Sequence, residues 1–171
     1  MKKQRELHMA ALETYVEQYG GRLSRLCYSL CKNTHDAQDL YQETWLRAIR
    51  AYDTYDEDRP FDVWLHRICI NCYRDMYRRA RAHGTVAFET TEHMEQFFSS
   101  LPDPDTTDRA DYAALYCAME TLTAEERAVI SLFYFDDYDG RTAAEMLGKT
   151  YSHFRIILYR ARNKLKGALQ S

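Results

Sequence analysis

The 171-residue sequence is poor in the residues that interrupt regular structure, with only six glycines and three prolines. Charged residues make up 29% of the chain. This combination favours helices and argues against a β-sandwich or barrel, whose many turns need glycine and proline. No apolar run approaches the length of a membrane span, and the first residues lack the apolar core of a signal peptide. The sequence therefore predicts an all-α, cytoplasmic protein that does not insert directly into a membrane.

Two kinds of active site have little support. There is no glycine-rich phosphate loop, and no hydrolase-like constellation of histidines and carboxylates converges. The five cysteines are an odd number, which argues against a disulfide framework in a reducing compartment. Cys27 with Cys31, and Cys69 with Cys72 near His66, also have spacings that a zinc or thiol site uses, but inward placement favours core packing. We expect no enzyme activity, no metal and no cofactor.

The net charge of −3 conceals an uneven distribution. Residues 1–82 carry 14 Lys/Arg against 12 Asp/Glu, residues 83–122 carry 1 against 8, and residues 123–171 carry 8 against 6. Periodicity fades over residues 83–111, which include two prolines of the run SSLPDPDTTD. The sequence therefore predicts two small helical domains, 1–82 and 112–171, joined by an acidic flexible linker, 83–111.

The first domain is expected to hold four helices. Hydrophobic periodicity places them over residues 5–19, 21–32, 36–52 and about 59–82. A strip of polar residues follows one face of the fourth helix at i, i+4, i+7 and i+11: Arg67, Asn71, Arg74 and Arg78. Guanidinium groups suit a phosphate backbone and a carboxamide suits a base edge, although a solvated helix face has the same pattern. Tyr55 and Trp64 beside the strip offer stacking surfaces for unpaired bases, and Trp64 also fits a core.

The second domain has the pattern of a helix-turn-helix. After a short helix over residues 112–122, Thr123 and Glu126 form a capping box. Asp139 is placed to cap a helix over 140–147, and a final helix runs from about 151 to 169. The inward face of the final helix is predicted to consist of Phe154, Leu158, Ala161 and Leu165. A plain helical hairpin is the alternative to DNA binding.

Two apolar residues are predicted on otherwise polar helix faces. Leu46 stands among Asp39, Glu43 and Arg50, where it is either an ordinary exposed leucine or part of a protein docking site. Ile156 lies on the outer face of the last helix, where it would meet a thymine methyl group or a protein partner.

The segments DAQDLYQETWLRAIRAY and RPFDVWLHRICINCYRD together resemble the second region of bacterial RNA polymerase sigma factors. The tail LTAEERAVISLFYF…AAEMLG…FRIILYRARNKL resembles the fourth region of the same family. The compact two-domain form is similar to the extracytoplasmic-function (ECF) group. This resemblance implies a region-two domain that docks on polymerase and melts the −10 element, and a region-four domain that recognises the −35 element. Core RNA polymerase, promoter DNA and an anti-sigma factor are the partners it implies.

The resemblance also implies roles for particular residues. The polymerase-docking residues are expected to be Asp36, Asp39, Gln42, Glu43 and Leu46. The residues expected at the −10 element are Tyr55, Trp64, Arg67, Asn71, Arg74 and Arg78, with Asn71 capturing a flipped base. Those expected at the −35 element are Tyr151, Ser152, His153, Arg155, Ile156, Tyr159 and Arg160. The tail departs from the family pattern at Lys149, Tyr151, His153, Ile156 and Ile157, which leaves the preferred −35 sequence open.

The sequence thus predicts a non-enzymatic sigma factor for promoter-specific transcription initiation. The main alternative is a helix-turn-helix transcriptional regulator that binds DNA without joining polymerase. A second alternative is a metal- or thiol-dependent sensor that uses the four helical cysteines.

Overall fold

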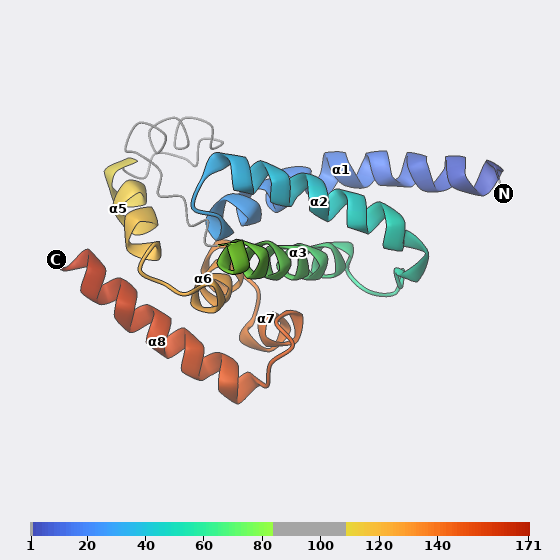
Figure 1. The fold of residues 1–171 in the computed structure, drawn as a ribbon. Coiled ribbons are helices and arrows are strands. Elements are labelled where there is room, and N and C mark those ends of the chain that lie inside the picture. The colour runs from blue at the N-terminus through green and yellow to red at the C-terminus, as the bar shows by residue number, and fades with distance from the viewer. Residues whose placement is uncertain (1, 84–108) are drawn as a thin grey trace.

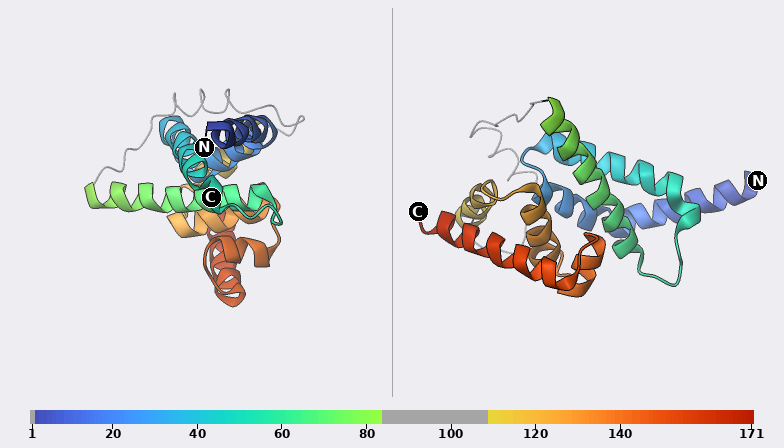
Figure 2. Two further views of the ribbon diagram at one scale, coloured as in Figure 1. Left: turned by 90° about the vertical axis from the view of Figure 1, so that its right-hand side faces the viewer. Right: turned by 60° about the horizontal axis from the view of Figure 1, so that its bottom comes forward.

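The computed structural model describes residues 2–83 and 109–171, and every regular element in these ranges is a helix. The elements are α1 (Lys2–Leu30), α2 (Thr34–Ala51), η1 (Tyr52–Thr54), α3 (Phe61–His83), α5 (Arg109–Met119), α6 (Ala124–Ile130), η2 (Ser131–Phe135), α7 (Gly140–Met146) and α8 (Tyr151–Leu169). In Figures 1 and 2 they form three tiers, with α1 and α2 in one, α3 and α6 in the next, and α7 and α8 in the last. The all-α prediction is confirmed; residues 84–108 of the expected linker lie outside the described part.

The helix α1 runs unbroken from Lys2 to Leu30, although the sequence predicts two helices over 5–19 and 21–32. The prediction of four helices in the first domain is therefore wrong, because three α-helices and the short η1 form its described part. Gly20 is the physical reason. A Cβ at Gly20 would lie 2.9 Å from Tyr41 Oη, so this glycine permits close contact between α1 and α2 instead of ending a helix.

The two predicted capping sites of the second domain are confirmed. Thr123 N donates to Glu126 Oε2 at 3.0 Å, and Glu126 N donates to Thr123 Oγ1 at 3.2 Å, which satisfies two free N–H groups at the start of α6. Asp139 Oδ1 accepts from the backbone N of Arg141 and of Thr142, both at 3.0 Å, and so begins α7. Between these helices the chain forms η2, a single π-helical turn.

The turn between α7 and α8 depends on a glycine with a left-handed backbone. Gly148 has φ +63°, and its N–H donates to Glu145 O at 3.0 Å while Lys149 N donates to Ala144 O at 2.9 Å. This pair of bonds is a Schellman motif, which stops α7 and turns the chain. Thr150 Oγ1 then accepts from His153 N at 3.2 Å and caps α8. The sequence thus builds a helix-turn-helix locally.

The inner face of α8 differs from the predicted one at a single position. Phe154, Ala161 and Leu165 are buried, as predicted, but Leu158 is only half-buried. Ile157 is buried in its place, because α8 faces both α6 and α7 and needs a wider apolar face than one stripe supplies.

The two halves of the chain pack against each other. Helices α1 and α3 contact α6, α1 also contacts η2, and α3 contacts α7. One continuous apolar cluster includes Leu26 and Leu65 from the first half with Val129, Leu132 and Leu147 from the second. A smaller cluster of the second half joins α5, the end of α6 and α8 through residues such as Met119 and Ala161. The predicted domains therefore share an extensive interface.

Replacing Gly148 by alanine should destabilise the protein by about 1 kcal/mol, because a Cβ is disfavoured at positive φ. Urea unfolding followed by circular dichroism measures this as a lower midpoint with an unchanged slope. Gly167→Ala is the matched control: Gly167 is in α8, a Cβ there meets nothing within 4 Å, and the change should be neutral or slightly stabilising. Equal midpoints for the two variants would contradict the assigned role of Gly148.

Candidate nucleic-acid and polymerase interfaces

The polar strip predicted on α3 is present, but its members differ in accessibility. Arg67, Asn71 and Arg78 are exposed, and the side chain of Arg78 is 78% exposed. Arg74 is half-buried, and its Nη2 donates to the backbone oxygen of Leu147 at 2.6 Å. Leu147 is the C-cap of α7, so the packing of the two halves occupies one of the four side chains of the predicted strip.

The C-terminal part of α3 borders a cleft of about 390 Å³. Arg74, Arg78 and Arg81 line it from α3, and Glu125 lines it from α6. Three guanidinium groups against one carboxylate give the cleft an excess of positive charge. It is therefore an anion-attracting surface, although α6 and Leu147 close one side of it.

Tyr55 and Trp64 lie together at the start of the strip. Their ring centroids are 5.0 Å apart, and Phe61, which is buried, lies 5.4 Å from Trp64. Tyr55 Oη donates to Arg59 O at 2.7 Å and thereby fixes the loop before α3. Both rings are half-buried, so part of each is core and part is available for contact.

The expected docking residues lie on the outer side of α2. Asp39, Gln42 and Leu46 are exposed, with Leu46 at 47%, and Glu43 is half-buried. Glu43 Oε1 accepts from Arg47 Nε at 2.8 Å, and Arg47 Nη1 donates to Asp75 Oδ2 on α3 at 2.8 Å. The hydrogen bond with Arg47 holds the pKa of Asp75 below its ordinary value. This charged chain fixes α2 on α3 and leaves Leu46 free at the surface.

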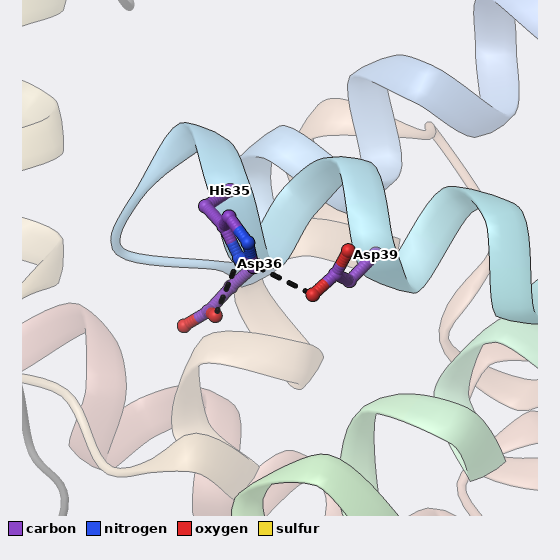
Figure 3. A group of neighbouring side chains, drawn as sticks. All are labelled: His35, Asp36 and Asp39. Atoms are coloured by element: carbon purple, nitrogen blue, oxygen red, sulfur yellow. Dashed lines mark ion pairs between the residues drawn. The ribbon is translucent and has the colours of Figure 1, made fainter.

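Figure 3 shows the first turn of the same α2 face, where His35 Nδ1 lies 3.2 Å from Asp39 Oδ2 and 3.9 Å from Asp36 Oδ1. These are ligand atoms of the types that bind metal ions. Their side chains are largely in solvent, with His35 81% exposed, and among the described residues the side-chain donor to Asp36 is Asn33, which is itself not buried. The group is best described as a solvated part of the acidic surface.

The outer face of α8 carries all seven residues expected at the −35 element. Every one is exposed: Tyr151, Ser152, His153, Arg155, Ile156, Tyr159 and Arg160. Lys149, where the resemblance leads one to expect an apolar residue, forms an ion pair with Glu125 of α6. That pair fixes the turn of the helix-turn-helix against α6. The start of α8 is therefore presented to solvent on a rigid support.

A buried polar cluster joins the two halves, and sequence reasoning missed it. From α1, Arg22 Nη1 donates to Asp62 Oδ2 at 2.6 Å and Nη2 donates to the backbone oxygen of Asp136 at 2.8 Å. Tyr138 Oη lies 2.8 Å from His66 Nδ1 and 3.3 Å from Asp62 Oδ2. Arg22 also stacks over the Tyr138 ring, with its Cζ 4.9 Å from the centroid. No local sequence signal indicates these contacts between distant residues.

Burial strongly shifts the pKa values of Asp136 and His66 in this cluster. Burial raises the pKa of Asp136 to about 7, although Arg22 and Arg25 oppose the rise. Burial lowers the pKa of His66 to about 3, and the charge of Arg22 adds to that effect. His66 is therefore neutral at pH 7, and its 3.5 Å contact with Asp136 Oδ2 is not an ion pair.

Several polar atoms at this interface have no hydrogen-bond partner among the described residues. They include His66 Nε2, Asp136 Oδ2, and Nε and Nη1 of Arg127. Arg127 is only 2% exposed, and burial lowers its pKa. Each such atom costs free energy that is recovered when the surface meets water. The apolar cluster thus stabilises the interface, whereas the polar atoms without partners among the described residues reduce its stability.

The cysteines behave as the core-packing interpretation predicts. Cys27, Cys31, Cys69 and Cys72 are all buried, and the sulfur atoms of Cys27 and Cys69 are 3.8 Å apart. Burial raises the pKa of Cys27, which keeps it a thiol and lowers its reactivity. Only Cys117 is exposed. The structure gives no support to a thiol-dependent sensor.

Comparison with known proteins shows the family. Residues 15–83 match the family Sigma-70 region 2, and residues 112–165 match Sigma-70, region 4. The ECF RNA polymerase sigma factor SigE of Mycolicibacterium smegmatis is 32% identical over 94% of this chain and 62% of that protein. SigG of Mycobacterium tuberculosis is 29% identical over 89% and 47%. The RNA polymerase sigma factor NccH of Alcaligenes xylosoxydans xylosoxydans is 30% identical over 91% and 85%. The chain thus spans less than two thirds of SigE and SigG.

Solved structures agree with this result. CnrH, solved in complex with the cytosolic domain of CnrY, has a TM-score of 0.68 at 28% sequence identity. The match covers 95% of this chain and 89% of the CnrH chain. The sigma factor RpoE, crystallised with the anti-sigma factor NepR from Bartonella quintana, has a TM-score of 0.73 and coverages of 92% and 96%. At 23% identity it supports the fold alone. In residues 2–83 and 109–171 no helix has the length and apolar character needed to cross a membrane. Region-two and region-four matches in order, together with the 30% identity to NccH over most of its length, establish that this chain belongs to the RNA polymerase sigma factors, and its relatives include the ECF sigma factors SigE and SigG.

Proposed function

We propose that this protein is a dissociable specificity subunit of RNA polymerase that directs transcription initiation at particular promoters and has no catalytic chemistry of its own. The observation that carries the proposal is the row of exposed Arg67, Asn71 and Arg78 on α3 together with a separate helix-turn-helix on the same chain. Membership of the sigma-factor family supports it. Residues 1–82 act at polymerase and the −10 element, and residues 112–171 act at the −35 element.

The outer side of α2 is the proposed docking surface for core RNA polymerase. Leu46 supplies an apolar contact, and Asp36, Asp39, Gln42 and Glu43 surround it with acidic and polar groups. An exposed leucine within a charged rim is typical of a protein interface. Because the ion pairs of Arg47 hold α2 rigidly on α3, docking also fixes the direction of the α3 strip.

The α3 strip is the proposed −10 contact. Arg67 and Arg78 bind phosphates, and Asn71 between them offers one donor and one acceptor to the edge of an unpaired base. Tyr55 and Trp64 supply stacking surface beside it. Unstacking a base costs a few kcal/mol, and these contacts offset that cost. Promoter choice is therefore partly a test of how easily the duplex opens.

The outer face of α8 is the proposed −35 contact, with its N-terminal residues in the major groove. Arg155 reaches a base edge, Ile156 suits a thymine methyl group, and Tyr159 and Arg160 lie further along the same face. An anti-sigma protein is a further proposed partner, by analogy with NepR and CnrY, which bind relatives of similar fold.

The proposal requires the two halves to separate. In the packed arrangement Arg74 is bonded to Leu147 and is unavailable to a DNA phosphate. The interface holds unpaired polar atoms of His66, Arg127 and Asp136, which regain hydrogen bonds in water. The packed arrangement is therefore a closed form that binding to core polymerase opens at moderate cost. This feature also separates the proposal from a regulator that binds DNA alone.

Run-off transcription with purified core RNA polymerase on a library of promoter-sized duplexes tests the proposal. Specific transcripts should appear only when this protein is added. Tight binding of the isolated protein to one duplex, without transcripts in the presence of core polymerase, would instead establish the DNA-binding regulator.

Asn71→Ala should reduce open-complex formation about tenfold, equivalent to about 1.4 kcal/mol, because one base loses its pocket contact. Its affinity for core polymerase should change less than twofold. Permanganate reactivity of unpaired thymines measures opening, and competition against the wild-type protein measures core binding. Asn163→Ala, which removes an exposed amide from α8, is the matched control and should leave both unchanged. Equal losses of opening and core binding would contradict the role of Asn71.

The packing of the two halves against each other, here called closure, should depend on pH. The buried groups Asp136 and His66 each shift the closure constant in their own direction. The pKa of Asp136 is about 7 in the closed form against an ordinary 3.8, so its contribution is present at low pH and is lost as pH rises through 7. The pKa of His66 is about 3 against 6.5, so its contribution increases as pH rises through 6.5. The two effects oppose each other. The closure constant of the wild type should therefore change less between pH 6 and 8 than that of a variant that keeps only one of the two groups.

Single variants separate these effects. His66→Gln keeps only the effect of Asp136, so its closure constant should fall about tenfold from about pH 6 to 8. Asp136→Asn keeps only the effect of His66, so its closure constant should rise about fourfold over the same interval. Energy transfer between dyes on the exposed Cys117 and on an introduced Gln38→Cys reports closure. Identical pH profiles for the three proteins would show that the cluster does not control closure.

A further inference from the structure

Tyr151, the first residue of α8, has an aromatic ring with three close neighbours. The guanidinium carbon of Arg141 lies 4.8 Å from the ring centroid of Tyr151, and that of Arg155 lies 5.8 Å from it. Gly140 lies against the ring, since a Cβ there would be 2.9 Å from Tyr151 Cε2. Arg141 and Gly140 belong to α7, whereas Tyr151 and Arg155 belong to α8. The stack therefore crosses both helices of the helix-turn-helix.

The two guanidinium groups of this stack keep their hydrogen-bonding capacity. In the described part of the chain neither Arg141 nor Arg155 forms an ion pair or side-chain hydrogen bond, and the guanidinium group of each lies over the Tyr151 ring. A guanidinium stacked on an aromatic face keeps its N–H edges directed outward in its own plane. Stacking also reduces the rotamer entropy that a free arginine loses on binding. The two side chains are thus preorganised donors at the start of α8.

We propose that Arg141 is a further DNA-contacting residue, that Arg155 reads a base, and that Tyr151 positions both. The inference rests on the proposed role of α8 at the −35 element. A helix-turn-helix places the start of its second helix in the major groove while its first helix crosses the backbone. Arg141, on the first helix, therefore faces a phosphate. Arg155, one turn into the second helix, faces the edge of a base pair, where arginine pairs with guanine.

The lack of a side chain at Gly140 explains why the bulky Tyr151 is accommodated at the start of α8. The Tyr151 ring fills the space that Gly140 leaves, and its centroid lies 4.8 Å and 5.8 Å from the guanidinium carbons of Arg141 and Arg155. The ring is 40% exposed, so its outer edge remains at the DNA-facing surface. Tyr151 is a positioning residue in this arrangement, because its effect on binding acts through the two arginines.

The test uses the complete protein bound to core RNA polymerase. The probe is a pool of duplexes with a constant downstream promoter and random bases across the upstream element. Selection gives base preference, and binding at several salt concentrations gives the number of phosphate contacts. Arg141→Ala should weaken binding to all sequences alike and lower the salt slope by about one, with an unchanged base preference. Arg155→Ala should relax the preference at one base pair at least fivefold.

The tyrosine variants distinguish positioning from structure. Tyr151→Ala should both reduce the salt slope and relax the preference, and Tyr151→Phe should restore both because it keeps the ring. Lys166→Ala, a charge removal in the last turn of α8, is the control and should leave the preference unchanged. An unchanged salt slope for Arg141→Ala, or a Tyr151→Phe protein that behaves like Tyr151→Ala, would overturn the inference. An absence of any upstream preference in the wild type would instead refute the proposed function of α8.

Discussion

The contact of Arg22 with both halves of the chain is the interaction on which the described arrangement depends. One guanidinium group bonds to the carboxylate of Asp62 in its own half and to the backbone oxygen of Asp136 in the other. Tyr138 and His66 complete the cluster beside it. Since His66, Asp136 and Tyr138 are buried and Arg22 is half-buried, hydrogen bonds of this cluster contribute to the position of α7 and α8 relative to α3 alongside apolar contact.

This arrangement occupies one residue of the proposed α3 contact and leaves the proposed α2 and α8 surfaces exposed. Arg74 is occupied, whereas the outer faces of α2 and α8 remain in solvent. In the proposed function, partner binding to α2 therefore does not require prior opening of the two halves, whereas use of Arg74 in the α3 strip does. Polar atoms at the interface that have no partner among the described residues offset part of its apolar stabilisation.

Much of the local structure was predictable because it depends on neighbours in sequence. The capping residues Thr123 and Asp139, the turn at Gly148 and the length of α8 follow from side-chain chemistry within a few residues. The exposure of Leu46 and Ile156 also follows from helical periodicity. The helix break predicted at Gly20 was wrong because the role of this glycine depends on Tyr41 in another helix.

The sequence by itself determined the all-α class, the helices after α1, the polar strip of α3, the exposed face of α8 and the family, since periodicity, capping and motifs are local properties. Only the tertiary structure decided that Arg74 is bonded to Leu147, that Ile157 is buried, and that Asp136 and His66 share one buried cluster with Arg22. These features join residues up to 114 positions apart, and hydrogen bonds and desolvation between such groups exist only once the chain has folded.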